Sequence, residues 1–159
     1  EAEGFDYFQL GGLNVSTNNK LVAFATDTVS RRQYFIRIKN LETDKIYDDI
    51  IENTTGGSVW ANDNKTLFYT KKDPVTLRSF KIFKHVLGTD ESEDLEVYHE
   101  KDETFNVSVA KTKSKKYIVV ASYSTVSSEY QVLDANNTDG ELKIIQPRER
   151  DLEYSVFWV

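Results

Sequence analysis

The sequence repeats itself along its length, and this repeat restricts the possible folds more than any other feature. Four short segments resemble the same strand, and they begin at Val15, Val59, Val107 and Tyr154. They are separated by about 44, 48 and 47 residues. A self-similarity with this period indicates a chain built from copies of one supersecondary unit.

Each unit contains four segments with strand character. The opening segment is followed by a polar turn and then by a strongly apolar run, at 21–25, 66–70 and 117–121. A third segment alternates apolar and polar residues, at 34–39, 80–86 and 130–133. The fourth is more polar, at 45–51, 95–98 and 142–145. Asn, Asp and Gly in the turns supply the backbone conformations that tight hairpins need.

Four strands in about 45 to 50 residues are typical of one blade of a β-propeller. We therefore predict an all-β fold, a partial β-propeller of about three four-stranded antiparallel blades and the first strand of a fourth. The predicted blades are 13–52, 57–100 and 105–146, with the next one starting at 152–159. Because propellers close with four to eight blades, the chain is expected to form an arc. An immunoglobulin-like sandwich is the alternative that the strand spacing leaves open.

Composition narrows the possible partners. A net charge of -6 argues against nucleic acid, which requires clustered cations. The longest apolar runs have about five residues, whereas a bilayer needs roughly twenty, so we expect no membrane segment. The absence of cysteine excludes disulfides and favours a reducing compartment, so the cytoplasm is expected and the periplasm is the alternative. There is no methionine either, and we expect the sequence to begin inside a longer protein.

No set of residues predicts a reaction centre. His85 and His99 lie on different predicted strands, without a second histidine at metal-ligand spacing, and are expected to be partly exposed. The segment 56–60, Gly-Gly-Ser-Val-Trp, departs from the G-x-S-x-G nucleophile motif at Trp60, and we interpret it as a turn between blades. We therefore expect no catalytic residue, no metal site and no cofactor in this chain.

Two runs of charge are interpreted as solvated surface. Residues 90–103 contain eight acidic side chains, with neither calcium-loop spacing nor an evident buried partner. They are expected to form a loop and an edge strand. Four lysines surround one hairpin tip, where the lack of interleaved aromatic residues indicates a solvated turn and not a nucleic-acid patch; they are Lys111, Lys113, Lys115 and Lys116.

The loops of an up-and-down blade alternate between the two faces of the disc. One face is expected to carry short turns, and the other the longer loops and the links between blades. The longer loops are rich in arginine, which makes them better candidates for contacts. The candidate interdomain contacts are Arg31, Arg32, Arg148 and Arg150. Ordinary surface charge and salt bridges between blades are the alternative explanation.

Several stretches resemble the oligopeptidase B branch of the prolyl oligopeptidase family of serine peptidases. They are Asp27-Thr28-Val29 with Arg31-Arg32-Gln33-Tyr34, the segment 60–65, His85-Val86-Leu87-Gly88-Thr89, Glu100-Lys101-Asp102 and Arg148-Glu149-Arg150-Asp151. The resemblance covers essentially the whole chain. It implies a seven-bladed propeller joined to an α/β-hydrolase domain with a Ser-Asp-His triad. It also implies cleavage of short peptides after Arg or Lys, with the propeller acting as a size filter.

The chain departs from the family in extent, because the catalytic α/β-hydrolase domain is absent and no triad or substrate-binding residue can be carried over. The leading hypothesis is a gating or scaffold propeller fragment, with the catalytic domain of the same parent chain as its partner and short basic peptides as the parent's substrate. The alternative is a stand-alone β-propeller interaction module. An arc exposes sheet faces, so we expect a homo-oligomer, with Phe157-Trp158-Val159 as the best candidate for an added strand.

The missing nucleophile motif predicts that the 159-residue chain has no peptidase activity. A chromogenic peptide containing Arg should be hydrolysed only at the background rate when it is incubated with this chain. Turnover that a serine-directed inhibitor abolishes would contradict this expectation.

Overall fold

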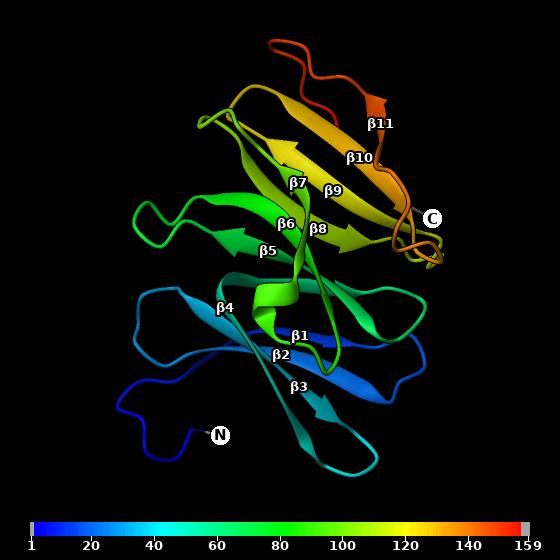
Figure 1. Cartoon of the computed structure of the whole chain (residues 1–159). Helices are drawn as coiled ribbons and strands as arrows, with labels where there is room; N and C mark the ends of the chain where they lie inside the picture. The colour runs from blue at the N-terminus through cyan, green and yellow to red at the C-terminus, as the bar shows by residue number, and fades with distance from the viewer. Residues whose placement is uncertain (1, 157–159) are drawn as a thin grey trace.

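The computed structural model describes residues 2–156, which form strands joined by turns and one short 3-10 helix (Figure 1). Eleven strands in this range make two antiparallel sheets. Seven strands follow one another in the first sheet, and four in the second. The predicted all-β fold of propeller blades is confirmed. No helix among these residues is long and apolar enough to cross a bilayer.

The first sheet consists of β1 (Gln9–Val15), β2 (Leu21–Asp27), β3 (Tyr34–Asn40), β4 (Ile46–Trp60), β5 (Thr66–Lys72), β6 (Ser79–Val86) and β7 (Leu95–His99). The second consists of β8 (Asn106–Lys111), β9 (Tyr117–Tyr123), β10 (Ser128–Asp134) and β11 (Lys143–Gln146). The 3-10 helix η1 (Glu91–Glu93) precedes β7. We call β1 to β3 with the first half of β4 blade 1, the second half of β4 with β5 to β7 blade 2, and β8 to β11 blade 3.

The junction of blades 1 and 2 differs from the prediction. We interpret 56–60 as a turn between blades from the sequence, but β4 continues through this segment to Trp60. Thr54 pairs with Tyr34 of β3 and also with Lys71 of β5, so the ladder passes directly from one blade to the next. The strand bends there because Gly56 adopts a φ of 84°, which only glycine reaches without strain.

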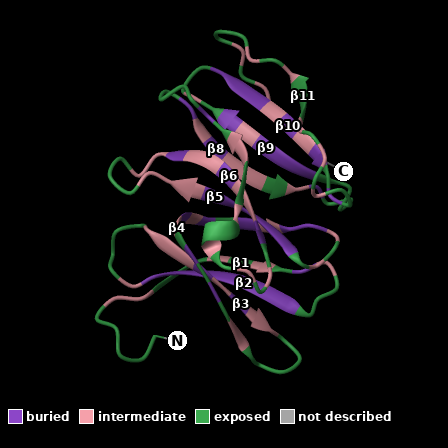
Figure 2. Ribbon diagram, in the orientation of Figure 1, coloured by how far each residue is buried: buried purple, intermediate pink, exposed green. Residues whose placement is uncertain are grey.

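The core lies between the blades, where both faces of the middle strands are covered. All seven residues of β2 are buried, as are five of β5, and Figure 2 shows purple along β2, β9 and β10. One cluster joins blades 1 and 2, with Ile36, Ile38 and Ile51 packed near Trp60 and Tyr69. A second joins blades 2 and 3 through Phe68, Ile82, Val107, Ile118 and Val120. Sheets covered on both sides account for the continuous apolar runs.

The start of a fourth blade is not formed in the described residues. Residues 152–156 have no strand, and Phe157, Trp158 and Val159 lie outside the described part of the chain. A strand needs a neighbour to complete its ladder, and the second strand of a fourth blade does not lie among the described residues. Tyr154 instead packs its ring 5.2 Å from that of Tyr130 and donates a hydrogen bond of 2.8 Å to the Gln146 carbonyl.

The close crossing of β1 and β4 predicts the effect of one methyl group. A Cβ on Gly12 would lie 2.1 Å from the backbone oxygen of Gly56, so Gly12→Ala should lower the free energy of unfolding by about 2 kcal/mol or more. The control is Gly57→Ala, whose Cβ would lie 3.2 Å from the movable hydroxyl of Thr55 and should change stability by less than about 1 kcal/mol. Urea unfolding measures both. Similar losses would show that the crossing is not tight.

Candidate functional site

The candidate site is the edge of the arc where the longer loops and the links between blades meet. We call it the loop face; it comprises the loops 28–33, 73–78 and 124–127 and the links 100–105 and 147–152. In Figure 1 the β2–β3 and β5–β6 loops lie on the left, while the β1–β2, β4–β5 and β8–β9 turns lie on the right. This is the predicted alternation of loops between faces.

Blades 1 and 2 are connected at this face by their two loops. Asp27 at the end of β2 accepts the backbone N–H groups of Val29 and Arg32, at 2.9 Å and 2.7 Å, and so shapes the β2–β3 loop. The carbonyl of Arg32 accepts a hydrogen bond of 2.6 Å from Lys72 at the end of β5. Partial burial and the nearby Arg32 charge lower the pKa of Lys72, although Asp27 opposes them. The Gln33 side-chain amide also donates a hydrogen bond of 2.9 Å to the Pro74 carbonyl in the β5–β6 loop.

Arg78 fixes the link from blade 2 to blade 3. Its Nε donates to the carbonyl of Phe105 at 2.8 Å, and its Nη2 donates to those of Glu100 and Asp102 at 3.0 Å and 2.5 Å. A guanidinium offers several N–H donors in a fixed plane, which suits three carbonyls around one turn. This side chain therefore sets the path of residues 100–105.

Arg148 connects blade 3 to blade 2 through a partly buried ion pair. Its Nη2 lies 2.6 Å from Oε2 of Glu100 and 3.5 Å from Oε1 of Glu129, and 3.3 Å from the Tyr98 hydroxyl. Its guanidinium carbon lies 4.1 Å from the centre of the Phe105 ring. Burial alone would raise the pKa of Glu100, but the hydrogen bond and charge of Arg148 outweigh it, and the pKa lies below its ordinary value.

The four predicted arginines fall into two groups. Arg31, Arg32 and Arg150 are exposed on the loop face, and 93% of the Arg150 side chain is accessible. Their role as interdomain contacts stays a prediction. Arg148 forms a salt bridge between blades, as the alternative explanation expects, and its role as an interdomain contact also stays a prediction. Its partner Glu100 was missed, because one buried acid in a long acidic run cannot be distinguished by its residue type.

Three predictions of solvent exposure were wrong for particular residues. Within the acidic run, the side chains of Asp94 and Glu100 are buried and hydrogen-bonded. His99 is partly exposed, as predicted, but only 1% of the His85 side chain is accessible. Alternate residues of β6 face opposite sides of the sheet, and position 85 faces the interior between blades. In the lysine turn Lys111 is also half-buried and donates to the Trp60 carbonyl.

A groove of about 790 Å³ opens on the loop face between the β5–β6 loop and the blade 2–3 link. Four cationic residues line it together with three acids: Arg32, Lys72, Arg78 and Lys101 with Asp73, Glu100 and Glu103. Arg78 is committed to backbone carbonyls and Glu100 to Arg148. The remaining groups suit a polar protein surface that offers carboxylates and carbonyls.

Removing Arg148 should destabilise the chain much more than removing Arg150. Arg148→Met leaves the Glu100 carboxylate buried without its partner, which should cost about 3 kcal/mol in thermal or urea unfolding at pH 7. Arg150→Met removes an exposed side chain 3.7 Å from Asp151 and should change stability by less than about 0.5 kcal/mol.

The pH dependence gives a second readout of the same pair. A lowered folded-state pKa stabilises above the unfolded value, about 4.3, and this contribution is lost as the pH falls through the folded value. The difference in the free energy of unfolding between the unsubstituted chain and Arg148→Met should therefore shrink in acid. A difference that is constant from pH 7 to pH 3 would contradict the role of Glu100.

Comparison with known proteins gives a consistent assignment. Residues 1–158 match the family described as prolyl oligopeptidase, N-terminal β-propeller domain. Dipeptidyl aminopeptidase BI of Pseudoxanthomonas mexicana is 44% identical over 95% of the chain, and Protease 2 of Moraxella lacunata is 29% identical over 98%. The chain spans only 21% and 23% of the lengths of these two relatives.

Solved structures agree. The structure of oligopeptidase B from Leishmania major superposes with a TM-score of 0.92 and 30% identity, covering 98% of this chain and 22% of that one. Oligopeptidase B from Trypanosoma brucei gives 0.88 and 29%, with the same coverage. These matches do not favour a stand-alone interaction module. The chain belongs to the prolyl oligopeptidase family, in which it matches the N-terminal β-propeller domain.

Proposed function

We propose that the parent enzyme hydrolyses short peptides after Arg or Lys, and that this propeller segment helps to restrict entry to small substrates. The observation that carries the proposal is the similarity to oligopeptidase B along 98% of the chain, with a TM-score of 0.92. The chain itself supplies three blades and no nucleophile motif. Its contribution is therefore scaffold and gate, and not chemistry.

We propose further that the loop face is turned toward the catalytic domain of the same parent chain. It has exposed arginines and a polar groove, whereas the turns on the opposite edge bond to one another. There the Asn62 side chain donates to the Lys115 carbonyl at 2.8 Å, and Asn18 N–H donates to Asn64 at 2.8 Å. An edge whose polar groups are already paired has less to offer a second domain.

A second candidate activity is the release of dipeptides from the amino end of a peptide. It is favoured by the relative named dipeptidyl aminopeptidase BI, whose identity of 44% exceeds the 29% of Protease 2. Both activities are compatible with the same propeller, because the propeller residues described do not include the catalytic groups.

The full-length gene product distinguishes the two activities. It would be assayed with one arginyl chromogenic peptide whose amino terminus is blocked and with a dipeptidyl substrate whose amino terminus is free. Cleavage of the blocked peptide after Arg supports the endopeptidase, and cleavage of the free dipeptidyl substrate alone supports the second candidate. Cleavage of neither would contradict both proposals.

Charge reversal tests the orientation of the propeller. In the full-length enzyme, Arg31→Glu combined with Arg32→Glu should lower kcat/KM by about tenfold, because the cations would meet the catalytic domain. The matched control, Lys113→Glu with Lys115→Glu on the opposite edge, should lower it by less than about twofold. Equal losses for the two pairs would show that the loop face has no special role.

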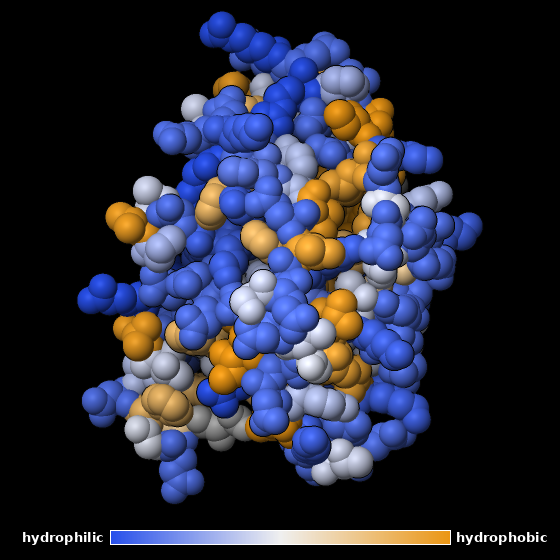
Figure 3. All heavy atoms as spheres, in the orientation of Figure 1, coloured by the Kyte–Doolittle hydropathy of each residue, from blue (hydrophilic) through white to orange (hydrophobic). Residues whose placement is uncertain are grey.

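We propose that the parent enzyme is located in the cytoplasm. For the separate 159-residue chain we propose self-association. Figure 3 shows apolar residues gathered at the upper right, over β10 and β11. Ile144 and Ile145 of β11 are 51% and 43% exposed, and such surfaces tend to find partners. Sedimentation at micromolar concentration tests this, and a monomer at all concentrations would contradict it.

A further inference from the structure

His85 is enclosed by carboxylates on both sides. Its Nδ1 lies 2.8 Å from Oδ1 of Asp94, and its Nε2 lies 3.1 Å from Oδ1 of Asp49. At most 4% of any of these three side chains is accessible. Both ring nitrogens are therefore within hydrogen-bonding distance of an acid, in a place from which water is largely excluded.

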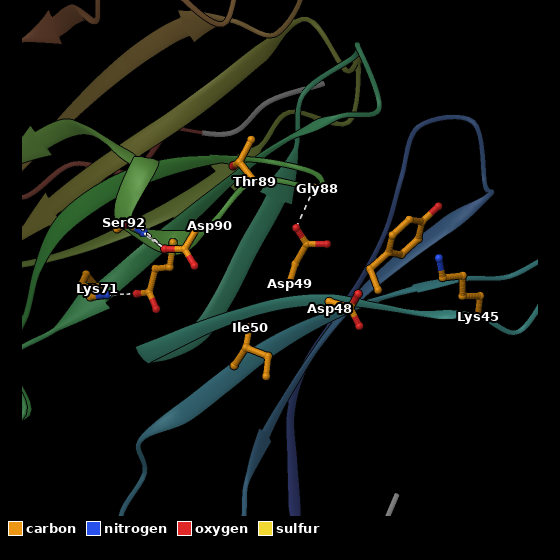
Figure 4. A pocket seen from close by; sticks show the side chains of 11 residues that line it. Lys45, Asp48, Asp49, Ile50, Lys71, Gly88, Thr89, Asp90 and Ser92 are labelled. Atoms are coloured by element: carbon orange, nitrogen blue, oxygen red, sulfur yellow. Dashed lines mark hydrogen bonds and ion pairs between the residues drawn. The ribbon is translucent and has the colours of Figure 1, made fainter.

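The carboxylates receive further hydrogen bonds, which assign their roles. The Tyr69 hydroxyl donates to Oδ2 of Asp94 at 2.9 Å. The Gly88 N–H donates to Oδ1 of Asp49 at 2.7 Å, as Figure 4 shows. An ionised carboxylate only accepts hydrogen bonds, whereas a neutral imidazole has one donor and one acceptor. Only the imidazolium can donate to Asp49 and Asp94 at the same time.

The cluster spans two blades. Asp49 lies in the first half of β4, which belongs to blade 1, whereas His85 and Asp94 belong to blade 2. Nearby, the Glu52 N–H of β4 donates to Glu91 of η1 at 3.1 Å, and Glu91 also pairs with Lys71 of β5. Asp49, Lys71, Asp90 and Glu91 also line the open groove of Figure 4, of about 910 Å³, beside the buried cluster.

We propose that His85 is a proton-dependent clamp between the first two blades. With its proton, the imidazolium bridges Asp49 of blade 1 and Asp94 of blade 2, and the three groups carry a net charge of one negative unit. When the proton leaves, the ring donates to only one carboxylate and turns a lone pair toward the other. Two buried negative charges then remain, beside Asp90 and the ion pair of Glu91 with Lys71.

The electrostatics agree with this geometry. Burial alone would lower the pKa of His85, but the hydrogen bonds and charges of Asp94 and Asp49 outweigh it and raise the pKa above its ordinary value. A raised folded-state pKa stabilises fully below the unfolded value of about 6.5. This contribution is lost as the pH rises through the folded value. The clamp should therefore open on the alkaline side of about pH 6.5.

The protonation state is measured directly, because the chain has only two histidines. Imidazole carbon and proton resonances would be followed by NMR between pH 5 and pH 10, with His99 as the internal control. His99 is 36% accessible, and its nearest carboxylate oxygen is 3.7 Å away. We expect His85 to titrate at a higher pH than His99. A His85 ring that is neutral at pH 6, or that titrates below His99, would overturn the proposal.

The mechanical part of the proposal is read from the Gly88 amide, which bonds to Asp49 across the blades. Its hydrogen-exchange protection factor, corrected for the intrinsic rate, should fall by at least about tenfold as the pH passes the His85 midpoint. In His85→Gln the Gly88 protection factor should be low and independent of pH. In His99→Gln it should change with pH as it does in the unsubstituted chain. Protection that does not change through the midpoint contradicts the clamp.

A second variant keeps the test decisive if His85→Gln fails to fold. Asp49→Asn removes one carboxylate and preserves the shape of the site, so the His85 midpoint should fall by about one pH unit or more. An unchanged midpoint would show that Asp49 does not hold the proton, and would overturn the proposal. These readouts need no peptidase activity, so they are independent of the proposed function.

Discussion

The structure depends on the fact that the middle strand of each blade is apolar on both faces. Residues of β2, β5 and β9 must be covered from two sides, and no single antiparallel sheet can supply both covers. Stacking of neighbouring blades supplies them, so the two core clusters lie between blades and not within one. The loops, links and ion pairs then arrange themselves around a geometry that hydrophobic burial has already selected.

Hydrophobic burial brings the blades together but is not directional. Hydrogen bonds and ion pairs at the junctions are directional, and they favour one relative orientation of the blades. Arg78 holds the blade 2–3 link by three carbonyls. Arg148, at the end of blade 3, forms an ion pair with Glu100, at the end of blade 2. Such groups lose hydration when they are buried, so they are tolerated only where every hydrogen bond has a partner. Their contribution is to make one arrangement of the blades much better than its neighbours.

Sequence reasoning located the strands well because their signal is local. The apolar run 21–25 lies in β2, and the run 117–121 lies in β9, since period and turn residues act over few positions. The continuity of β4 was missed, because two glycines at 56–57 suggested a turn whereas the ladder around Thr54 decided for a strand. The burial of His85 and Glu100 could not be predicted either. Their partners Asp49 and Arg148 are distant in the sequence, and charge alone does not show which surface a strand residue faces.

Because β4 runs without a break from blade 1 into blade 2, the repeating unit of the sequence and the hydrogen-bonded unit of the structure are not the same. The sequence repeats by the blade, whereas the first hydrogen-bonded sheet contains two blades. A gene can duplicate one blade of the repeat, but the first two copies here share a single hydrogen-bonded ladder. Recombination of such blades would find a boundary between two sheets at 101–104, whereas at 52–57 the chain is inside a continuous strand. Inserted domains, new termini and swapped blades are therefore expected to leave both sheets intact at the first place, where they would disturb only the Arg78 hydrogen bonds to the link, and to break a sheet at the second.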